Sequence, residues 1–224
     1  MEAPRRTRFK ICCISSIDEA KLAVAHGASA LGLVASMPSG PGVISESMIA
    51  EIAETIPPGV ASFLLTSRQD IAAIIDQQLR CGVNSIQICD RLTRGTHHEL
   101  RQALPGIGLV QVIHVLDDSS IDEARLVAPH VNAILLDSGN PKLATKELGG
   151  TGRVHNWQIS RKIRDAVNVP VYLAGGLNAD NVANAIAQVR PFGVDICSGV
   201  RTDGRLDDIK LAAFCKNVLA STPQ

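Results

Sequence analysis

Two side chains that are far apart in the sequence could exchange protons with a substrate. Cys12 follows the strand-like residues Lys10 and Ile11, and Asp137 directly follows the apolar run 133–136. If Cys12 faces the mouth of the fold, it is a candidate acid–base residue. An aspartate directly after an apolar run cannot be buried unpaired without a large cost, so Asp137 either caps a turn or faces an open site. Each residue also has an ordinary interpretation, because cysteines often fill space in a core and aspartates often begin turns. The pair predicts proton-transfer chemistry only if the fold brings the two side chains together.

The immediate neighbours of Cys12 bear on its charge. Alternation along an extended strand places Lys10 and Cys12 on one face and Cys13 on the other. A positive charge on the same face favours the thiolate, so Lys10 is expected to lower the pKa of Cys12. Cys13 is expected to face the surrounding helices and to be structural. The six cysteines show no CxxC pair and no spacing typical of a disulfide scaffold, so we expect reduced thiols.

Glycines after two further apolar runs predict a phosphate site. Gly175 and Gly176 follow one run, and Ser198 and Gly199 follow the next. Glycine lets the backbone approach a ligand closely, and converging N–H groups can bind an anion without Lys or Arg. A Gly-Gly pair is also an ordinary turn. Two such motifs at consecutive strand ends nevertheless favour phosphate, as in many barrels.

The histidines do not indicate a metal site. His97 and His98 are adjacent at the start of an expected helix and therefore point in different directions, whereas a metal needs three or four converging ligands. His114 could face the interior of the fold. His155 could contact a substrate beside the glycine-rich segment 149–152. We expect no metal.

Strand-like and helix-like runs alternate along the whole chain. The expected strands cover residues 8–14, 29–34, 60–65, 84–88, 109–115, 131–136, 169–174 and 193–197. The expected helices cover residues 17–26, 45–55, 68–80, 96–103, 119–128, 157–167, 179–188 and 207–220. Eight units in 224 residues give 28 residues per unit, which predicts an α/β protein with a single (βα)8 TIM barrel. An open, doubly wound sheet would show the same alternation of strands and helices. We favour it less, because no GxGxxG motif follows the first strand.

The boundaries of the expected domain leave little outside the barrel. We assign residues 1–7 to an N-terminal tail and residues 8–224 to the barrel domain. Two segments, 35–44 and 137–156, are longer than the compact repeat requires, and both follow strands. Such segments lie on the face where barrel enzymes build their active sites. Ser16 and Glu19 have the spacing of a capping box at the first helix.

Composition excludes several classes of partner. The 22 basic and 22 acidic residues cancel, so no charge excess points to nucleic acid or to a membrane surface. No apolar run reaches 18 residues, and no signal peptide is visible. These features predict a soluble cytoplasmic protein.

Taken in order, these motifs resemble the phosphoribosylanthranilate isomerase family over roughly residues 8–219. The resemblance is carried by Lys10-Ile11-Cys12, Leu136-Asp137, Gly149-Gly150-Thr151-Gly152, Trp157, 173–177 and 194–200. It implies a barrel enzyme of tryptophan biosynthesis that needs no cofactor. The family's reaction is an Amadori rearrangement, which converts an aminoaldose to an aminoketose. The expected partner is a small phosphorylated sugar, and the expected assembly is a monomer or a homodimer.

The resemblance also implies a role for individual residues. Cys12 corresponds to the general base and Asp137 to the general acid. The phosphate pocket corresponds to Gly175, Gly176, Ser198 and Gly199. Further substrate contacts are expected from Lys10, Gln87 and Gly150.

Three departures from the family pattern concern the rest of the substrate. Cys13 replaces a glycine, and Cys89-Asp90 replaces His-Gly after the fourth strand. Gly42 stands where the family has an arginine that binds the anthranilate carboxylate. An isomerase-like paralogue with another phosphorylated amino-sugar as substrate therefore remains an alternative, as does a non-catalytic phosphate-ligand binder. A metal-dependent aldolase or epimerase barrel is less favoured, because it would need a cluster of ligands at the strand ends and the sequence shows none. A Schiff-base aldolase is also less favoured, because it would need a lysine at the end of a later strand, and the sixth and seventh strands end in Asp137 and Gly175.

Overall fold

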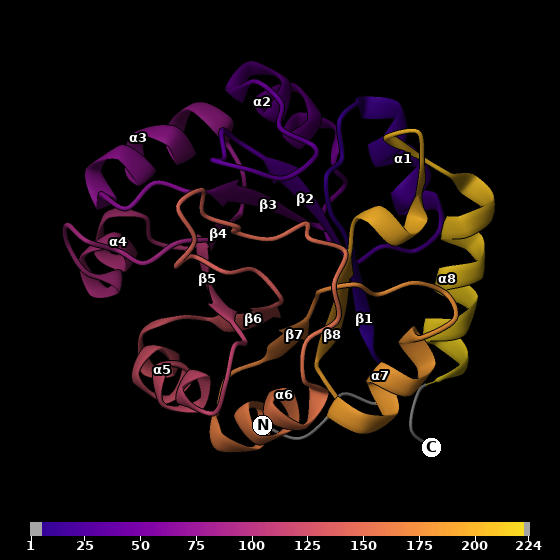
Figure 1. The fold of residues 1–224 in the computed structure, drawn as a ribbon. Helices are drawn as coiled ribbons and strands as arrows, with labels where there is room; N and C mark the ends of the chain where they lie inside the picture. Colours follow the sequence, from indigo (N-terminus) through magenta and orange to yellow (C-terminus); the bar gives the residue numbers. More distant parts are fainter. Residues whose placement is uncertain (1–5, 222–224) are drawn as a thin grey trace.

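Eight parallel strands close into one barrel with helices around it (Figure 1) in the computed structural model, which describes residues 6–221. The strands are β1 (Arg8–Ile11), β2 (Ala30–Val34), β3 (Ala61–Thr66), β4 (Ser85–Ile88), β5 (Gly108–His114), β6 (Ala133–Asp137), β7 (Val171–Leu173) and β8 (Gly193–Ile196). They pair in chain order, and β8 returns to pair with β1. The predicted TIM barrel is therefore confirmed over the open sheet.

The helices follow the strands as the sequence predicts. They are α1 (Ile17–Ala25), α2 (Glu46–Thr55), α3 (Ile71–Cys81), α4 (His97–Ala103), α5 (Ser119–Val127), α6 (Trp157–Ala166), α7 (Val182–Val189) and α8 (Asp208–Ala220). Residues 1–5 of the expected N-terminal tail and residues 222–224 of the expected barrel range lie outside the described residues. No helix within residues 6–221 is long and apolar enough to cross a bilayer.

Apolar side chains divide between two layers because successive strand residues point to opposite faces. Leu64 of β3 packs outward in the layer that also contains Ile74 of α3. Phe63 and Leu65 belong to the smaller cluster inside the barrel, where the edge of the Tyr172 ring lies against Phe63 at 6.2 Å between centroids. A barrel interior filled in this way is a rigid floor for a site at its C-terminal face.

The predicted capping box at the first helix is only half formed. The Ser16 hydroxyl accepts a hydrogen bond from the Glu19 N–H at 3.2 Å, so Ser16 is the N-cap of α1. The Glu19 carboxylate does not return to the N–H of Ser16. It instead accepts hydrogen bonds from the Ser15 N–H and from Arg201. The spacing predicted the helix start correctly and the second partner wrongly, because a tertiary contact took the carboxylate.

The first strand ends earlier than expected, and this changes where Cys13 points. Strand β1 stops at Ile11 instead of residue 14, and Cys13 has a left-handed backbone, with φ of 62°. The alternation rule therefore fails at this residue. Cys13 does not face the helices, as expected, but lies beside Cys12 in the inner cluster.

The expectation of reduced thiols is also wrong. Cys13 forms a disulfide with Cys197, although 184 residues separate them. Their Cα atoms are 5.9 Å apart because barrel closure places the ends of β1 and β8 side by side. The other four cysteines, Cys12, Cys81, Cys89 and Cys215, are free and buried.

A short hairpin after β8 was not predicted. A 3-10 turn over Ser198–Val200 leads into β9 (Arg201–Thr202), which pairs with β10 (Arg205–Leu206). Each strand has two residues, too few to show an apolar alternation in the sequence.

Candidate active site

One cleft at the C-terminal end of the barrel collects most of the predicted site residues. Those that line it are Cys12, Gln87, Asp137, Gly150, Gly175, Gly176 and Ser198. The predicted residues Lys10 and Gly199 do not line it. The segment after β6 crosses above the barrel mouth in Figure 1. The thiol and the carboxyl group that sequence analysis singled out therefore face the same space.

Lys10 lies beneath the cleft rather than in it. Its side chain is fully buried, and its ammonium group is 2.8 Å from Asp195 Oδ2. Burial by itself lowers the pKa of Lys10, but the adjacent Asp195 and Cys12 outweigh burial, and the pKa is raised. Lys10 therefore stays charged and forms a buried ion pair that spans β1 and β8.

The Cys12 thiol is protonated in the free enzyme. Burial raises the pKa of Cys12 to about 11. The Lys10 ammonium lowers this pKa, as expected from the sequence, but burial and, to a smaller extent, Asp195 raise it and together outweigh Lys10. The prediction that Lys10 favours the thiolate is thus right in sign, while burial decides the outcome.

Asp137 has the environment of a general acid. The side chain is buried, and burial raises the pKa of Asp137 despite a hydrogen bond from the Ser138 N–H to Oδ1 at 2.7 Å. The other oxygen, Oδ2, faces Gly149, where a Cβ atom would come within 2.6 Å of it. Glycine at position 149 therefore leaves this oxygen open.

The two glycine turns predicted to bind phosphate lie against each other. Gly175 and Gly176 both have left-handed backbones, with φ of 84° and 62°. A Cβ on Gly176 would meet the backbone of Arg153 at 2.7 Å, and one on Gly199 would meet the carbonyl oxygen of Leu177 at 2.2 Å. Only glycine fits at these positions, so the two turns can pack closely against their neighbours beside the cleft.

The histidines near this end of the barrel are held by neighbours. His114 is in register with Asp137, and its Nε2 donates to the Cys89 carbonyl oxygen at 3.0 Å. His155 lies next to Gly175 and bonds the Ser160 hydroxyl at 2.7 Å. Burial lowers the pKa of His155 to about 4, so its ring is neutral. Within residues 6–221, no group of three or more His, Cys, Asp or Glu could hold a metal ion.

The two long loops meet over the cleft. The Ser39 hydroxyl of the 35–44 segment donates to the Lys146 carbonyl oxygen at 2.7 Å, and Lys146 Nζ lies 2.5 Å from Asp90 Oδ2. The Ser138 and Thr151 hydroxyls, 2.7 Å apart, close the base of the second loop. These contacts make a roof from segments that are more than a hundred residues apart.

The part of the cleft near residue 42 is uncharged. Its lining there includes Val34, Met37, Leu65 and Leu148, and no Lys or Arg is among the described residues that line the cleft. Gly42 cannot be exchanged simply, because a Cβ there would lie 2.4 Å from the Cβ of Cys13. Cys13 therefore fits here only because residue 42 is a glycine.

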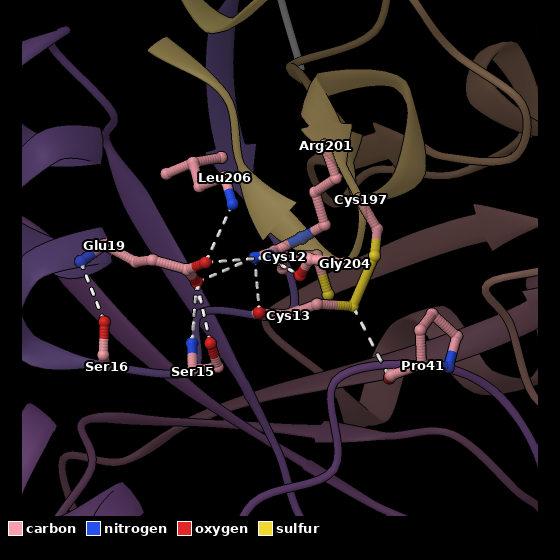
Figure 2. Close-up of polar contacts among 10 residues, drawn as sticks. All are labelled: Cys12, Cys13, Ser15, Ser16, Glu19, Pro41, Cys197, Arg201, Gly204 and Leu206. Atoms are coloured by element: carbon pink, nitrogen blue, oxygen red, sulfur yellow. Dashed lines mark hydrogen bonds and ion pairs between the residues drawn. A yellow bond between two sulfur atoms is a disulfide. The ribbon is translucent and has the colours of Figure 1, made fainter.

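A buried cluster behind Cys12 fixes its backbone (Figure 2). Arg201 forms a bidentate pair with Glu19, with Nη1–Oε1 and Nη2–Oε2 distances of 2.9 and 3.0 Å. Its Nη2 also donates to the carbonyl oxygens of Cys12 and Cys13. Sequence analysis missed Arg201, Asp195 and the disulfide, because nothing local to these residues indicates their partners.

Comparison with known proteins agrees with this geometry. The model of the N-(5'-phosphoribosyl)anthranilate isomerase family matches residues 9–217. This chain belongs to that family. An N-(5'-phosphoribosyl)anthranilate isomerase of Methanocella arvoryzae is 33% identical over 205 residues, which cover 92% of this chain and 94% of the relative. One of Haloferax volcanii is 35% identical, over 90% of this chain and 88% of the relative.

Solved structures of the family share the fold. The crystal structure of phosphoribosyl anthranilate isomerase from Thermotoga maritima has a TM-score of 0.78 and 29% identity, and covers 95% of this chain and 98% of that one. Another structure of a phosphoribosyl anthranilate isomerase, in complex with reduced 1-(o-carboxyphenylamino)-1-deoxyribulose 5-phosphate, has a TM-score of 0.75 and 28% identity, over 95% and 98% of the two chains. The resemblance seen in the sequence is therefore confirmed, and the chain is an isomerase of the tryptophan-biosynthesis type.

Proposed function

We propose that this chain catalyses the Amadori rearrangement of N-(5'-phosphoribosyl)anthranilate to carboxyphenylamino-deoxyribulose 5-phosphate. The observation that carries the proposal is the convergence of Cys12, Asp137 and the two glycine turns on one cleft. An acid, a base and an anion site are the groups that a phosphorylated aminoaldose requires. Membership of the family supports the same reaction.

Asp137 acts first, as the general acid. Its proton passes to the ribose ring oxygen, the bond between that oxygen and C1′ breaks, and the nitrogen lone pair forms an iminium ion at C1′. Burial raises the pKa of Asp137 and so favours the protonated carboxyl group that this step requires. The open Oδ2 beside Gly149 is the atom from which the proton leaves.

Cys12 acts second, as the general base. Its thiolate removes the C2′ proton, and the electron pair of that C–H bond neutralises the iminium to give an enolamine, which tautomerises to the ketone. The resting thiol has a pKa of about 11, so it must first release its proton to water, and this ionisation needs help. The positive iminium ion formed in the first step supplies it, because a nearby positive charge favours a thiolate.

Several neighbouring groups orient the substrate. The N–H groups near Gly176 and Gly199 bind the phosphate, and Gln87 presents a buried amide oxygen that has no partner among the described residues. Gln87 and Gly150 are proposed substrate contacts. Lys10 lies beneath the cleft and does not contact the substrate, but it pairs with Asp195, which lines the cleft. No cofactor takes part in this proposal.

A second candidate substrate has a specific observation in its favour. The region near Gly42 and Cys13 carries no cation among the described residues that line the cleft. A phosphorylated amino-sugar whose nitrogen bears an uncharged group would leave no carboxylate unpaired there. The chemistry at Cys12 and Asp137 would be unchanged.

The remaining expectations belong to the same proposal. We propose a cytoplasmic enzyme that works as a monomer or homodimer on a small phosphorylated sugar and binds neither nucleic acid nor membrane. The even balance of charge supports this partner class.

Turnover of N-(5'-phosphoribosyl)anthranilate tests the proposal directly. Cys12→Ser and Asp137→Asn should each lower kcat about 10²- to 10⁴-fold, the contribution of a positioned acid or base. Cys215→Ala, far from the cleft on α8, is the matched cysteine control and should keep the wild-type kcat. Full activity in both site variants would show that the roles are wrong.

A further inference from the structure

The turn that carries Cys12 is attached to the phosphate-binding turn by two separate links. The Cys13–Cys197 disulfide joins the residue after Cys12 to the residue before Ser198. Arg201 follows the Ser198–Val200 turn directly, and its guanidinium reaches back to the carbonyl oxygens of Cys12 and Cys13. In Figure 2 the guanidinium lies between Glu19 and the backbone of the two cysteines.

Arg201 and Glu19 form a buried ion pair that makes further hydrogen bonds to the backbone, although Arg201 Nε has no partner among the described residues. The side chains of Arg201 and Glu19 are only 7% and 12% exposed, so their pairing is shielded from water. Arg201 Nη1 also donates to the Gly204 carbonyl oxygen at 2.9 Å, and Glu19 also accepts from the Leu206 N–H at 2.8 Å. Burial by itself raises the pKa of Glu19, but the hydrogen bonds from Arg201, Leu206 and Ser15 lower it, so the carboxylate stays charged.

The guanidinium shape matters at this place. The two terminal nitrogens of the guanidinium donate to the two carboxylate oxygens of Glu19. Nη2 also donates to the carbonyl oxygens of Cys12 and Cys13, just after strand β1. A lysine ammonium carries the same charge but cannot present a planar fork to a carboxylate and to the backbone together. The backbone at Cys13, whose φ is 62°, is thus held where a non-glycine residue rarely rests.

We propose that Arg201 is a positioning residue of the isomerisation. It does not line the cleft, and it acts through the backbone of Cys12. By tying this turn to the phosphate turn, it fixes the distance between the base and the sugar phosphate, so that a bound phosphate places C2′ under the thiol. The inference rests on the proposed function, because it assigns Cys12 the role of base.

Steady-state kinetics of Arg201→Gln tests the proposal. A small displacement of the base from C2′ should lower kcat about 10- to 100-fold. KM should change less than about threefold, because the phosphate donors are backbone groups of other residues. Arg205→Gln is the matched control: Arg205 is exposed and has no part in the cluster, so its variant should keep both constants.

Chemical rescue separates positioning from folding. In Arg201→Ala, millimolar guanidinium should restore part of kcat, whereas urea, which has the planar shape without the charge, should not. Arg201→Lys should remain impaired for the same geometric reason. If Arg201→Gln fails to fold, Glu19→Gln provides the second variant, since it loosens the fork without removing it and should also lower kcat more than it raises KM.

The outcomes are distinguishable from failure of the proposed function. Wild-type enzyme without turnover would contradict the proposed reaction itself. Active wild-type enzyme with a folded Arg201→Gln variant of unchanged kcat would overturn the positioning role. So would a variant whose loss lies wholly in KM, or a loss that urea restores as well as guanidinium does.

Discussion

Gly42 and Cys13 share the space of one side chain. A Cβ atom on residue 42 would lie 2.4 Å from the Cβ of Cys13, and Gly42 has a φ of 80°. The family resemblance places a carboxylate-binding arginine at 42 and a glycine at 13. The structure shows that these two departures depend on each other, because an arginine at position 42 and a cysteine at position 13 cannot both fit in this space.

This relationship predicts how anthranilate recognition can be gained. Gly42→Arg alone should not help, because it clashes with Cys13. Added to Cys13→Gly, the arginine should contribute about 1.5–3 kcal/mol to binding, while its left-handed backbone should cost about 1 kcal/mol in the free energy of unfolding. KM for N-(5'-phosphoribosyl)anthranilate should then fall about 10- to 150-fold relative to Cys13→Gly alone. A gain in the single Gly42→Arg variant would contradict the shared-space interpretation.

Ionisation of Cys12 should require strongly alkaline pH in the free enzyme. Burial raises its pKa to about 11, and the thiolate, not the thiol, is the nucleophile. The rate of iodoacetamide modification at Cys12, followed by peptide mass spectrometry, should therefore rise with pH throughout the neutral range and level off only near pH 11. Asp195→Asn removes a neighbouring negative charge that raises this pKa, so the midpoint should move to lower pH. A midpoint below that of an ordinary cysteine would show that Lys10 outweighs burial.

A methyl group beside Asp137, the proposed general acid, should lower kcat selectively. In Gly149→Ala the new Cβ would lie 2.6 Å from Asp137 Oδ2, so we expect kcat to fall about 100-fold or more as the proton donor is blocked or displaced. Gly59→Ala is the matched control, since Gly59 also has a positive φ, 96°, but no heavy atom within 4 Å of its Cβ position. It should lose about 1 kcal/mol of stability and keep its kcat. Equal kinetic losses in the two variants would point to backbone strain instead.

The disulfide should stabilise the closed barrel. A bond between residues 184 positions apart restricts the unfolded chain, which predicts a gain of about 2–4 kcal/mol in the free energy of unfolding. Dithiothreitol should therefore lower the urea midpoint of the wild-type protein. Cys197→Ser should have the lower midpoint from the start and show no response to the reductant. An unchanged wild-type midpoint after verified reduction would contradict this expectation.

The sequence by itself determined the barrel, its eight units and the main candidate residues. Alternating apolar runs, and polar or glycine residues where they end, are local patterns, and each strand end necessarily faces the same mouth. For this reason the sequence alone indicates Cys12, Asp137, Gly175 and Gly176, and all four line the cleft.

Only the tertiary structure decided how these residues are held and charged. Closure of β8 on β1 makes neighbours of positions nearly two hundred residues apart, so the Cys13–Cys197 bond and the Arg201–Glu19 pair leave no trace in local spacing. The charge state of Cys12 depends on the competition between its burial and the charges of Lys10 and Asp195. Burial is a property of the packed barrel, which is why the sequence could name the thiol but not its pKa.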